Sequence, residues 1–209
     1  MLISLVDILR CPRPHAETWL VASIDRVELR DIIDGTLGCP NCHAEYPIRG
    51  GIVYFDEEVR RPEADDPSEA QAVRLAAGLE LIDPRMLAVL HGSWGTHAPL
   101  VRGIAPTPLL LVNPPVEIAS GDGISIIVAH GAPLARGSVD AVAVDGGASA
   151  DMAGALGSSL RGGRRMLAPA KLPVPAGFTE LARDAEVWVA QLEAHAVTSA
   201  PIMPARRAR

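Results

Sequence analysis

Aromatic residues are scarce in this chain and make up only 3% of its 209 residues. Hydrophobic residues still make up 48%, so a core must be built from Leu, Val, Ile and Ala. Nucleic-acid-binding surfaces usually interleave basic and aromatic side chains, and this chain has few of the latter. Its net charge of −6 also argues against binding through bulk electrostatics. We therefore expect no nucleic-acid partner.

Long hydrophobic runs are also missing, and none approaches the roughly 18 residues that a membrane helix needs. The opening stretch MLISLVDILRC contains Asp7 and Arg10 and has no cleavage-site pattern, so it does not read as a signal peptide. The chain has only three cysteines, which is too few for a disulfide framework. We expect a soluble protein without a transmembrane segment that works in the reducing cytoplasm.

A change of composition divides the chain into two main parts. Residues 1–55 hold all three cysteines and the β-type segments TWLVASI and GIVYF. Residues 56–69 are charged and broken by proline, as expected of a linker. Residues 70–200 then read as an α/β domain, and residues 201–209 as a basic, frayed tail.

The second part begins with helix signals and continues with buried strands. Ser68, with Gln71 three residues later, predicts a helix N-terminus. Asp83-Pro84 predicts a second short helix that ends near Gly92. Five apolar runs predict strands buried on both faces: 109–112, 124–128, 141–144, 165–168 and 187–190. Segments 149–160 and 177–184 are expected to supply helices between them.

The cysteines suggest a metal site. Cys39 and Cys42 form a CxxC, which places two thiolates on one tight turn, as tetrahedral zinc requires. A second turn offers Cys11 and His15. Together these four residues would form a closed Cys3His zinc site, which holds structure and leaves no open position for catalysis.

Two other interpretations of these residues remain open. Cys39 and Cys42 would form a redox pair in a βαβ setting, but no such setting surrounds them. His15 would be an exposed turn residue if the site lacked metal or used another fourth ligand. His43 is a weaker candidate ligand, because it is expected to point away from the CxxC turn.

The surrounding residues carry a family resemblance. LVDILRCP and CPNCHAEYPIRGGIVYF resemble the small zinc-ribbon proteins that activate methyltransferases, together with their short bacterial relatives. The resemblance covers about residues 2–55, although Pro14 stands where the family usually has a further cysteine. In that family the apolar face of the ribbon pairs with a methyltransferase, sometimes in the same chain. The resemblance therefore implies an interaction module and a protein partner.

Three later segments resemble class I S-adenosylmethionine-dependent methyltransferases: HGAPLARGSVDAVAVDGG, SSLRGGRRMLAP and GFTELARDAEVWVAQ. The resemblance implies a Rossmann-like sheet with flanking helices and a closing antiparallel hairpin. It also implies a cofactor site in a glycine-rich turn after the first strand, because glycine lets the backbone approach the ligand.

The sequence departs from that family where the cofactor is held. We take Leu109–Val112 as the first strand, and its turn is then Asn113-Pro114-Pro115, where proline removes amide donors. Only 11 residues separate Val112 from Ile124, too few for the usual helix, strand and acidic turn, so we expect a helix-sized unit to be missing and the sheet to be truncated. The alternative turn HGSWGTH (91–97) is set aside because it is expected to follow a helix. Binding of S-adenosylmethionine is therefore not expected, and no catalytic or cofactor-binding residue is assigned.

These observations favour a non-catalytic protein. We interpret the chain as a zinc ribbon fused to a degenerate methyltransferase-like domain, a pseudoenzyme that acts as a scaffold or accessory subunit. The alternative is an active S-adenosylmethionine-dependent methyltransferase, or an activator of one, that acts on RNA or protein. A free-standing nucleic-acid-binding zinc protein is a third hypothesis, which the acidic composition disfavours.

Overall fold

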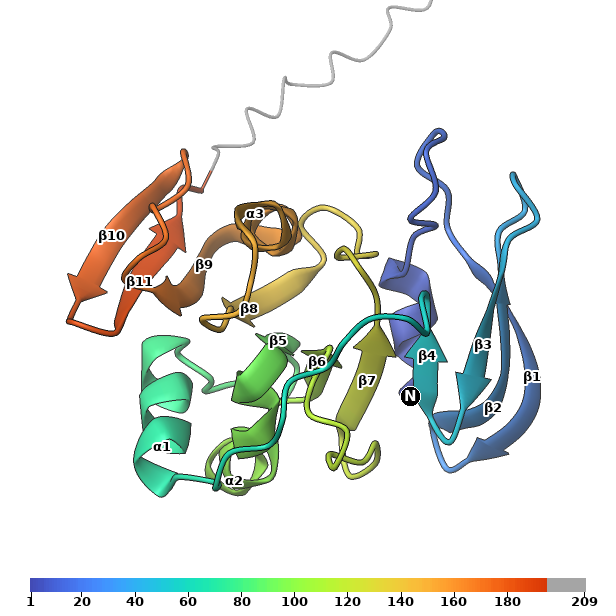
Figure 1. Cartoon of the computed structure of the whole chain (residues 1–209), viewed down its shortest axis with the longest axis horizontal. Coiled ribbons are helices and arrows are strands. Elements are labelled where there is room, and N and C mark those ends of the chain that lie inside the picture. The colour runs from blue at the N-terminus through green and yellow to red at the C-terminus, as the bar shows by residue number, and fades with distance from the viewer. Residues whose placement is uncertain (195–209) are drawn as a thin grey trace, which may run out of the picture.

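A computed structural model describes residues 1–194, which form one 11-stranded mixed sheet (Figure 1). The strand order is β1-β2-β3-β4-β7-β6-β5-β8-β9-β11-β10. The predicted basic tail at 201–209, and the end of the predicted second domain at 200, lie outside the described residues. The predicted fold class, α/β with a small β part followed by a Rossmann-like sheet, is confirmed.

The N-terminal part is an antiparallel meander at one end of the sheet (Figure 1). It follows a short 3₁₀ helix, η1 (Ile3–Ile8). Its strands are β1 (Val21–Glu28), β2 (Asp31–Gly38), β3 (Glu45–Arg49) and β4 (Ile52–Tyr54). Leu5 of η1 and apolar side chains of the inner strands, such as Ile32, Leu37 and Ile48, are buried and form the core of this part.

The second part has five parallel strands and a closing antiparallel hairpin. The parallel strands are β5 (Ala88–His91), β6 (Leu109–Val112), β7 (Ile124–Val128), β8 (Val139–Ala143) and β9 (Leu160–Pro169). The hairpin is β10 (Phe178–Arg183) with β11 (Val187–Leu192). Every residue of β5 to β8 is buried, as the continuous apolar runs predict.

Helices cover both faces of the parallel strands. They are α1 (Glu69–Gly78), the 3₁₀ helix η2 (Gly92–His97), α2 (Ala98–Ile104) and α3 (Ala150–Ser158). Leu75 of α1 and Val101 of α2 share one core with Leu90 and Leu111. The opposite face belongs to the core that contains Leu156 of α3. Because strand side chains alternate between faces, the same apolar runs supply both cores.

The predicted helix starts and segments had mixed outcomes. Ser68 caps α1, and its hydroxyl accepts from the amide of Gln71, so that prediction is confirmed. The helix predicted from Asp83-Pro84 is wrong: Asp83 closes a single turn with the amides of Arg85 and Met86, and the chain then enters β5. The helix predicted at 177–184 is also wrong, because that segment pairs with β11 as an edge strand.

The position of β5 corrects the strand assignment. Numbered from β5 in chain order, the second part of the sheet reads 3-2-1-4-5-7-6, the order of a doubly wound fold with a hairpin at its edge. The first strand is therefore β5 and not Leu109–Val112. No strand is missing. What the 11 residues between β6 and β7 lack is the usual crossover helix, since residues 113–123 contain neither helix nor strand.

The two parts are joined through the sheet itself. β4 pairs in parallel with β7, with Ile52, Val53 and Tyr54 opposite Ile126, Ile127 and Val128. Val53 and Ile127 are fully buried in one shared core. The amide of Leu2 also donates to the Ser125 hydroxyl at 2.9 Å. The last strand of the N-terminal part thus extends the parallel sheet of the second.

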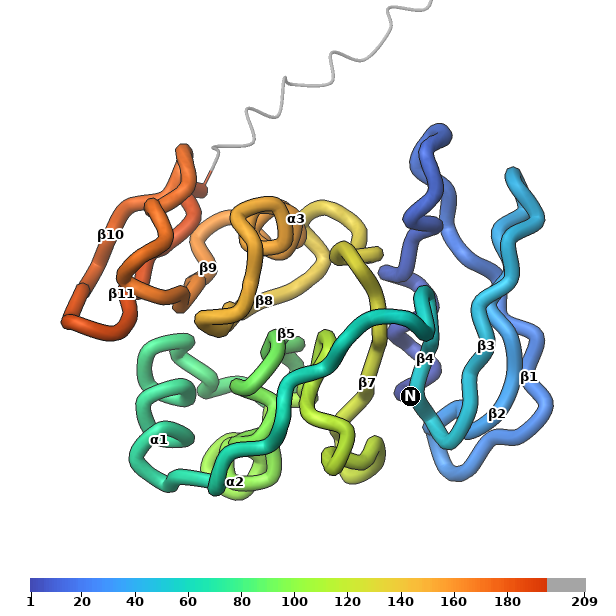
Figure 2. Tube along the Cα trace, in the orientation of Figure 1, coloured from blue at the N-terminus to red at the C-terminus, as the bar shows by residue number. Residues whose placement is uncertain are grey.

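Residues 56–68 lead from β4 across to α1 and contain no helix or strand (Figure 2). Arg61 attaches this segment to the body, because its guanidinium donates to the carbonyls of Pro114 and Pro115 at 2.6 Å each. In contrast, residues 63–67 are exposed. None of the helices within residues 1–194 is long and apolar enough to cross a membrane.

Cleavage of the exposed stretch tests the seam between β4 and β7. We predict that a protease site placed at 63–67 can be cut without separating the two fragments, because backbone pairing and a shared core hold them together. Gel filtration of the cut protein should give one peak of unchanged size that contains both fragments. The same sample in denaturant is the control and should separate. Separation under native conditions would contradict the seam.

Candidate metal centre and switch-point cleft

All four predicted metal ligands lie together at the tip of the N-terminal part. The ligand atoms of Cys11, His15, Cys39 and Cys42 are within 4.8 Å of one another. Cys11 and His15 come from the loop between η1 and β1, and the CxxC follows β2. The cluster does not include His43, which is exposed.

The distances in the cluster fit a tetrahedral metal. Metal–sulfur bonds of about 2.3 Å imply sulfur–sulfur edges of about 3.8 Å and sulfur–nitrogen edges of about 3.5 Å. The Sγ atoms of Cys11 and Cys42 are 3.7 Å apart. His15 Nε2 lies 3.2 Å from Cys11 Sγ and 3.5 Å from Cys39 Sγ. Since all four ligand atoms lie within 4.8 Å of one another, small adjustments of the side chains suffice for them to hold one metal ion.

The local backbone favours the thiolate form of Cys39. Burial alone raises the pKa of this thiol, but hydrogen bonds from the backbone amides of Cys42 and Asn41 outweigh it and bring the pKa below its ordinary value. The turn closes on itself, because the amide of Cys39 donates to Ala44 and the amide of His43 donates to Cys39. His43 has a positive φ of 55° there, which turns its side chain out of the ligand set.

Tyr46 supports the cluster from outside. Its hydroxyl lies 3.2 Å from Cys11 Sγ, and the tyrosine is buried beneath the ligands. Burial and the neighbouring Cys11 raise the pKa of Tyr46, so the hydroxyl stays protonated and can donate to the sulfur. Such an outer contact orients a metal ligand and offsets part of its charge.

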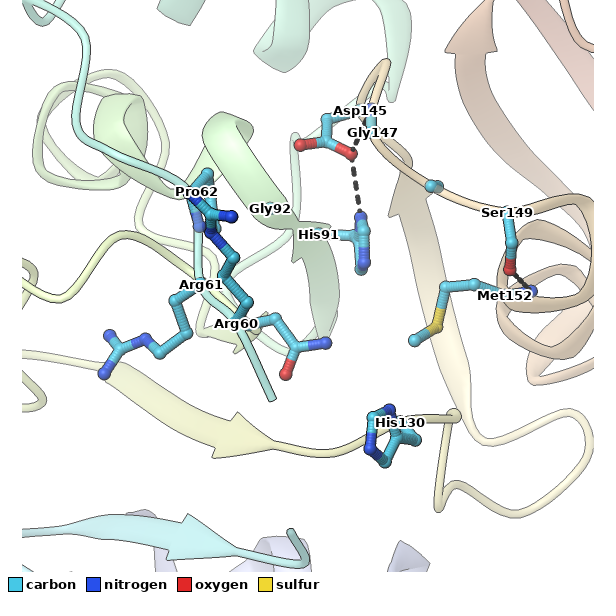
Figure 3. Close-up of a pocket in the computed structure, with 12 residues that line it drawn as sticks. Arg60, Arg61, Pro62, His91, Gly92, His130, Asp145, Gly147, Ser149 and Met152 are labelled. Atoms are coloured by element: carbon cyan, nitrogen blue, oxygen red, sulfur yellow. Dashed lines mark hydrogen bonds and ion pairs between the residues drawn. The ribbon is translucent and has the colours of Figure 1, made fainter. Parts of the chain in front are cut away.

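A second site lies at the carboxyl ends of the parallel strands. The chain runs from β5 to β6 in one direction and reaches β8 on the other side, so the switch point of the sheet lies between β5 and β8. Ligands of doubly wound folds bind at this point. A cleft of about 400 Å³ opens there (Figure 3). Its walls include His91, Asn113, His130 and Asp145 from the ends of four neighbouring strands.

Asp145 fills the turn that follows the first parallel strand. Its carboxylate accepts from His91 Nδ1 at 3.1 Å, from the Ser93 amide at 2.8 Å, from the Ser93 hydroxyl at 3.1 Å and from the Gly147 amide at 3.1 Å. Burial raises the pKa of Asp145, but these hydrogen bonds outweigh it and hold the pKa below its ordinary value. The carboxylate is therefore ionised and fully engaged.

The same turn is closed from two further sides. Gly92 has a φ of 63°, and a Cβ placed on it would overlap the Asp145 carboxylate. A Cβ on Gly95 would lie 2.6 Å from Cβ of Pro114. The indole of Trp94 donates to the Val144 carbonyl at 3.0 Å. The glycines of HGSWGTH therefore make room for the protein's own groups.

Asn113-Pro114-Pro115 ends β6, the second strand of the parallel sheet. The Asn113 amide group donates to the Ala129 carbonyl at 2.8 Å and accepts from the Ala129 amide at 2.9 Å. It thereby ties the ends of β6 and β7 together. Pro114 packs against Gly95. This turn supports its neighbours and is not the turn that follows the first strand.

Sequence reasoning missed the pairing of His91 with Asp145. The two residues lie 54 positions apart in the chain. A signal was present: His91 and Asp145 each stand where an apolar run ends, and the ends of parallel strands meet at one edge of a sheet. Reading AVLH as a helix end concealed it.

Comparisons with known proteins agree with the N-terminal prediction. Residues 3–51 match the family model described as Trm112p-like protein, which confirms the predicted resemblance for this segment. No curated protein sequence matches the chain. Because the family match covers less than half of the chain, it describes the N-terminal part and not the whole protein.

Several solved methyltransferase structures are similar to the chain at low identity. One is a geranyl diphosphate C-methyltransferase from Streptomyces coelicolor, with 18% identity, coverage of 47% of this chain and 43% of that one, and a TM-score of 0.41. A SAM-dependent O-methyltransferase from Thermotoga maritima has 12% identity, coverage of 65% and 68%, and a TM-score of 0.43. A putative methyltransferase from Escherichia coli has 13% identity, coverage of 66% and 92%, and a TM-score of 0.42.

The chain thus spans less than half the length of the geranyl diphosphate enzyme. The fold of the second part is established by its own strand order, and these weak similarities add nothing about activity.

Removal of one histidine should identify the fourth metal ligand. We predict that His15→Ala lowers zinc affinity at least about 100-fold, because loss of a direct ligand should cost no less than loss of an outer contact. His43→Ala is the matched control, since His43 is a neighbouring exposed histidine, and it should leave affinity unchanged. Competition with a chromophoric chelator measures both. Full zinc retention by His15→Ala would reassign the ligand.

A single methyl group should test the filled turn. We predict that Gly92→Ala lowers the free energy of unfolding by about 2 kcal/mol or more, because the added Cβ meets the Asp145 carboxylate and the positive φ is strained. Gly154→Ala in α3 is the control: its Cβ meets nothing within 4 Å, so stability should stay equal or rise. Urea unfolding of both variants measures the two free energies. Equal stability of Gly92→Ala and the parent protein would contradict the close packing of Asp145 against Gly92.

Proposed function

We propose that the protein is a non-catalytic accessory subunit in which a zinc ribbon and a methyltransferase-like α/β body form one scaffold. This proposal rests on one observation, which is that the turn after β5 is filled by a side chain of the protein. In a doubly wound fold this turn binds the cofactor through its backbone amides and its open space. Here Asp145 takes the Ser93 amide and the space beside Gly92.

Asp145 also occupies hydrogen-bond donors of that turn that a ligand would otherwise use. Asp145 is ionised and buried, and its four hydrogen bonds fix it in place. A ligand carboxylate or hydroxyl that approached the Ser93 amide would have to displace it. Breaking those bonds would leave buried donors without partners, at a cost of about 1–3 kcal/mol each. Binding of S-adenosylmethionine would have to exceed that cost.

The ribbon supports the scaffold in two ways. Its last strand β4 extends the sheet beside β7, so the edge that could pair with another chain is occupied by this one. Zinc bound by Cys11, His15, Cys39 and Cys42 would hold the loops at the other end of the ribbon. A closed set of four protein ligands leaves no position for a reacting water, so the metal's contribution is structural.

The outer strand β1 supports a protein partner. Several of its apolar side chains are exposed, including Val21 at 62% and Val27 at 49%, and Trp19 just before it is exposed at 55%. Exposed apolar side chains concentrated on one edge strand support a protein-binding surface. A cytoplasmic location and the absence of a nucleic-acid partner belong to the same proposal, and the small number of cysteines and the net charge of −6 support them.

An active methyltransferase is the second candidate. The cleft of about 400 Å³ at the switch point favours it, because small-molecule sites of this fold lie there. His91 is also arranged like a general base, since Asp145 holds its Nδ1 and leaves the other ring nitrogen for a substrate. This candidate needs Asp145 to leave the turn when the cofactor binds.

Cofactor binding separates the two candidates. We predict no heat of binding when S-adenosylmethionine is titrated into the zinc-loaded protein, and no methyl transfer from labelled cofactor, with or without co-purifying proteins. An active methyltransferase measured under the same conditions is the positive control. Binding at micromolar concentration, or incorporation of label above background, would overturn the non-catalytic proposal in favour of the enzyme.

A further inference from the structure

Two adjacent arginines beside the cleft make no ion pair in the described part of the chain. Within residues 1–194 neither Arg60 nor Arg61 forms an ion pair, although both line the cleft (Figure 3). Arg61 is half-buried, and its guanidinium donates to the carbonyls of Pro114 and Pro115. Burial lowers the pKa of Arg61, but arginine keeps its charge in proteins. Glu117 lies near enough to act on the charge of Arg61 but forms no ion pair with it, so an anion in the cleft would further offset the cost of the half-buried guanidinium.

His91 offers a second polar group to the same space. The residue is 7% exposed, and its Nδ1 lies 3.1 Å from the ionised Asp145, so Nδ1 carries the proton. No partner within residues 1–194 bonds to the other ring nitrogen, Nε2. Figure 3 shows the far side of the ring turned away from Asp145, into the open space above His130. In the neutral ring, Nε2 is an acceptor for a hydroxyl or N–H group.

The remaining charges of the cleft leave it suited to an anion. The carboxylate of Asp145 is already engaged by four donors. His130 stands at the rim, where it lies 3.2 Å from Asp56, and it is largely exposed. Met152 and Ala148 supply an apolar wall. A volume of about 400 Å³ admits a small metabolite and is larger than a bare phosphate requires.

We propose that the switch-point cleft binds a small organic anion that also carries a hydroxyl group, with the anion against Arg60 and Arg61 and the hydroxyl donating to His91 Nε2. The anion is a phosphate or a carboxylate, since a guanidinium donates to the oxygens of both in the same geometry. Such a ligand would couple the segment 56–68 to the strand ends. The inference holds whether or not the protein is catalytic, because it rests on the arginines and His91 and not on the cofactor turn.

Calorimetry with simple probes tests this proposal. D-ribose 5-phosphate supplies a phosphate with hydroxyls, and citrate supplies carboxylates with a hydroxyl. Free D-ribose lacks the anion and inorganic phosphate lacks the sugar hydroxyls. We expect saturable binding of ribose 5-phosphate or citrate, no binding of ribose, and weaker binding of inorganic phosphate. Which of the two organic anions binds more tightly identifies the source of the charge.

Variants locate the binding. Arg60→Gln and Arg61→Gln should each weaken the tighter probe by about tenfold, which is the loss of one charge-assisted contact. Arg60 makes no hydrogen bond within residues 1–194, so its replacement tests binding without disturbing the fold. Arg136→Gln is the matched control: this arginine is exposed, forms no ion pair within the described chain and lies outside the cleft.

His91→Gln should weaken ribose 5-phosphate more than inorganic phosphate, because only the former offers a sugar hydroxyl to Nε2. No saturable binding of either organic anion would overturn the proposal. An equal loss of affinity in Arg60→Gln and Arg136→Gln would also overturn it, as it would show non-specific attraction. Binding of S-adenosylmethionine in the titration described above would overturn the non-catalytic function. The proposal of an anion site in the cleft would still be decided by the calorimetry with ribose 5-phosphate and citrate.

Discussion

The parallel pairing of β4 with β7 is the interaction on which the rest of the structure depends. It places a cysteine-containing meander against the edge of a doubly wound sheet and merges their cores around Val53 and Ile127. An unpaired edge strand is open to aggregation and to other partners, and this pairing covers that edge within the chain. It also fixes where residues 56–68 begin, and so brings Arg60 and Arg61 to the carboxyl ends of the strands.

The hydrogen bonds made at those strand ends determine how the function of the molecule is interpreted. A glycine turn follows the first strand, as in a cofactor-binding fold, yet Asp145 reaches it from the end of β8. The glycine at position 92 is then explained without a ligand, because the absence of a Cβ leaves room for that carboxylate. The strand order of a doubly wound fold is thus present, and side chains of the protein occupy the turn after its first strand.

Much of this could be predicted from the sequence, because local signals agreed with the global fold. Cys11, His15, Cys39 and Cys42 were identified by spacing, and the five apolar runs by composition. The errors share a cause. The segment AVLH is too short for its hydrophobic pattern to distinguish a strand from a helix, and the strong helix-start signal Asp83-Pro84 precedes it. Because β5 was not recognised as a strand, the first strand was assigned to β6. The proline turn after β6 was then interpreted as a cofactor loop that had lost its glycines. The contact of His91 with Asp145 depends on strand order, which no local pattern contains.

Amide hydrogen exchange at Ser93 tests the central claim most directly. If Asp145 permanently fills the turn, the Ser93 amide is protected in the ligand-free protein, because it donates to that carboxylate at 2.8 Å. A large molar excess of S-adenosylmethionine should leave its exchange rate unchanged. Rapid exchange of Ser93 without ligand, followed by protection when S-adenosylmethionine is added, would contradict the account and show that the turn is a working cofactor site.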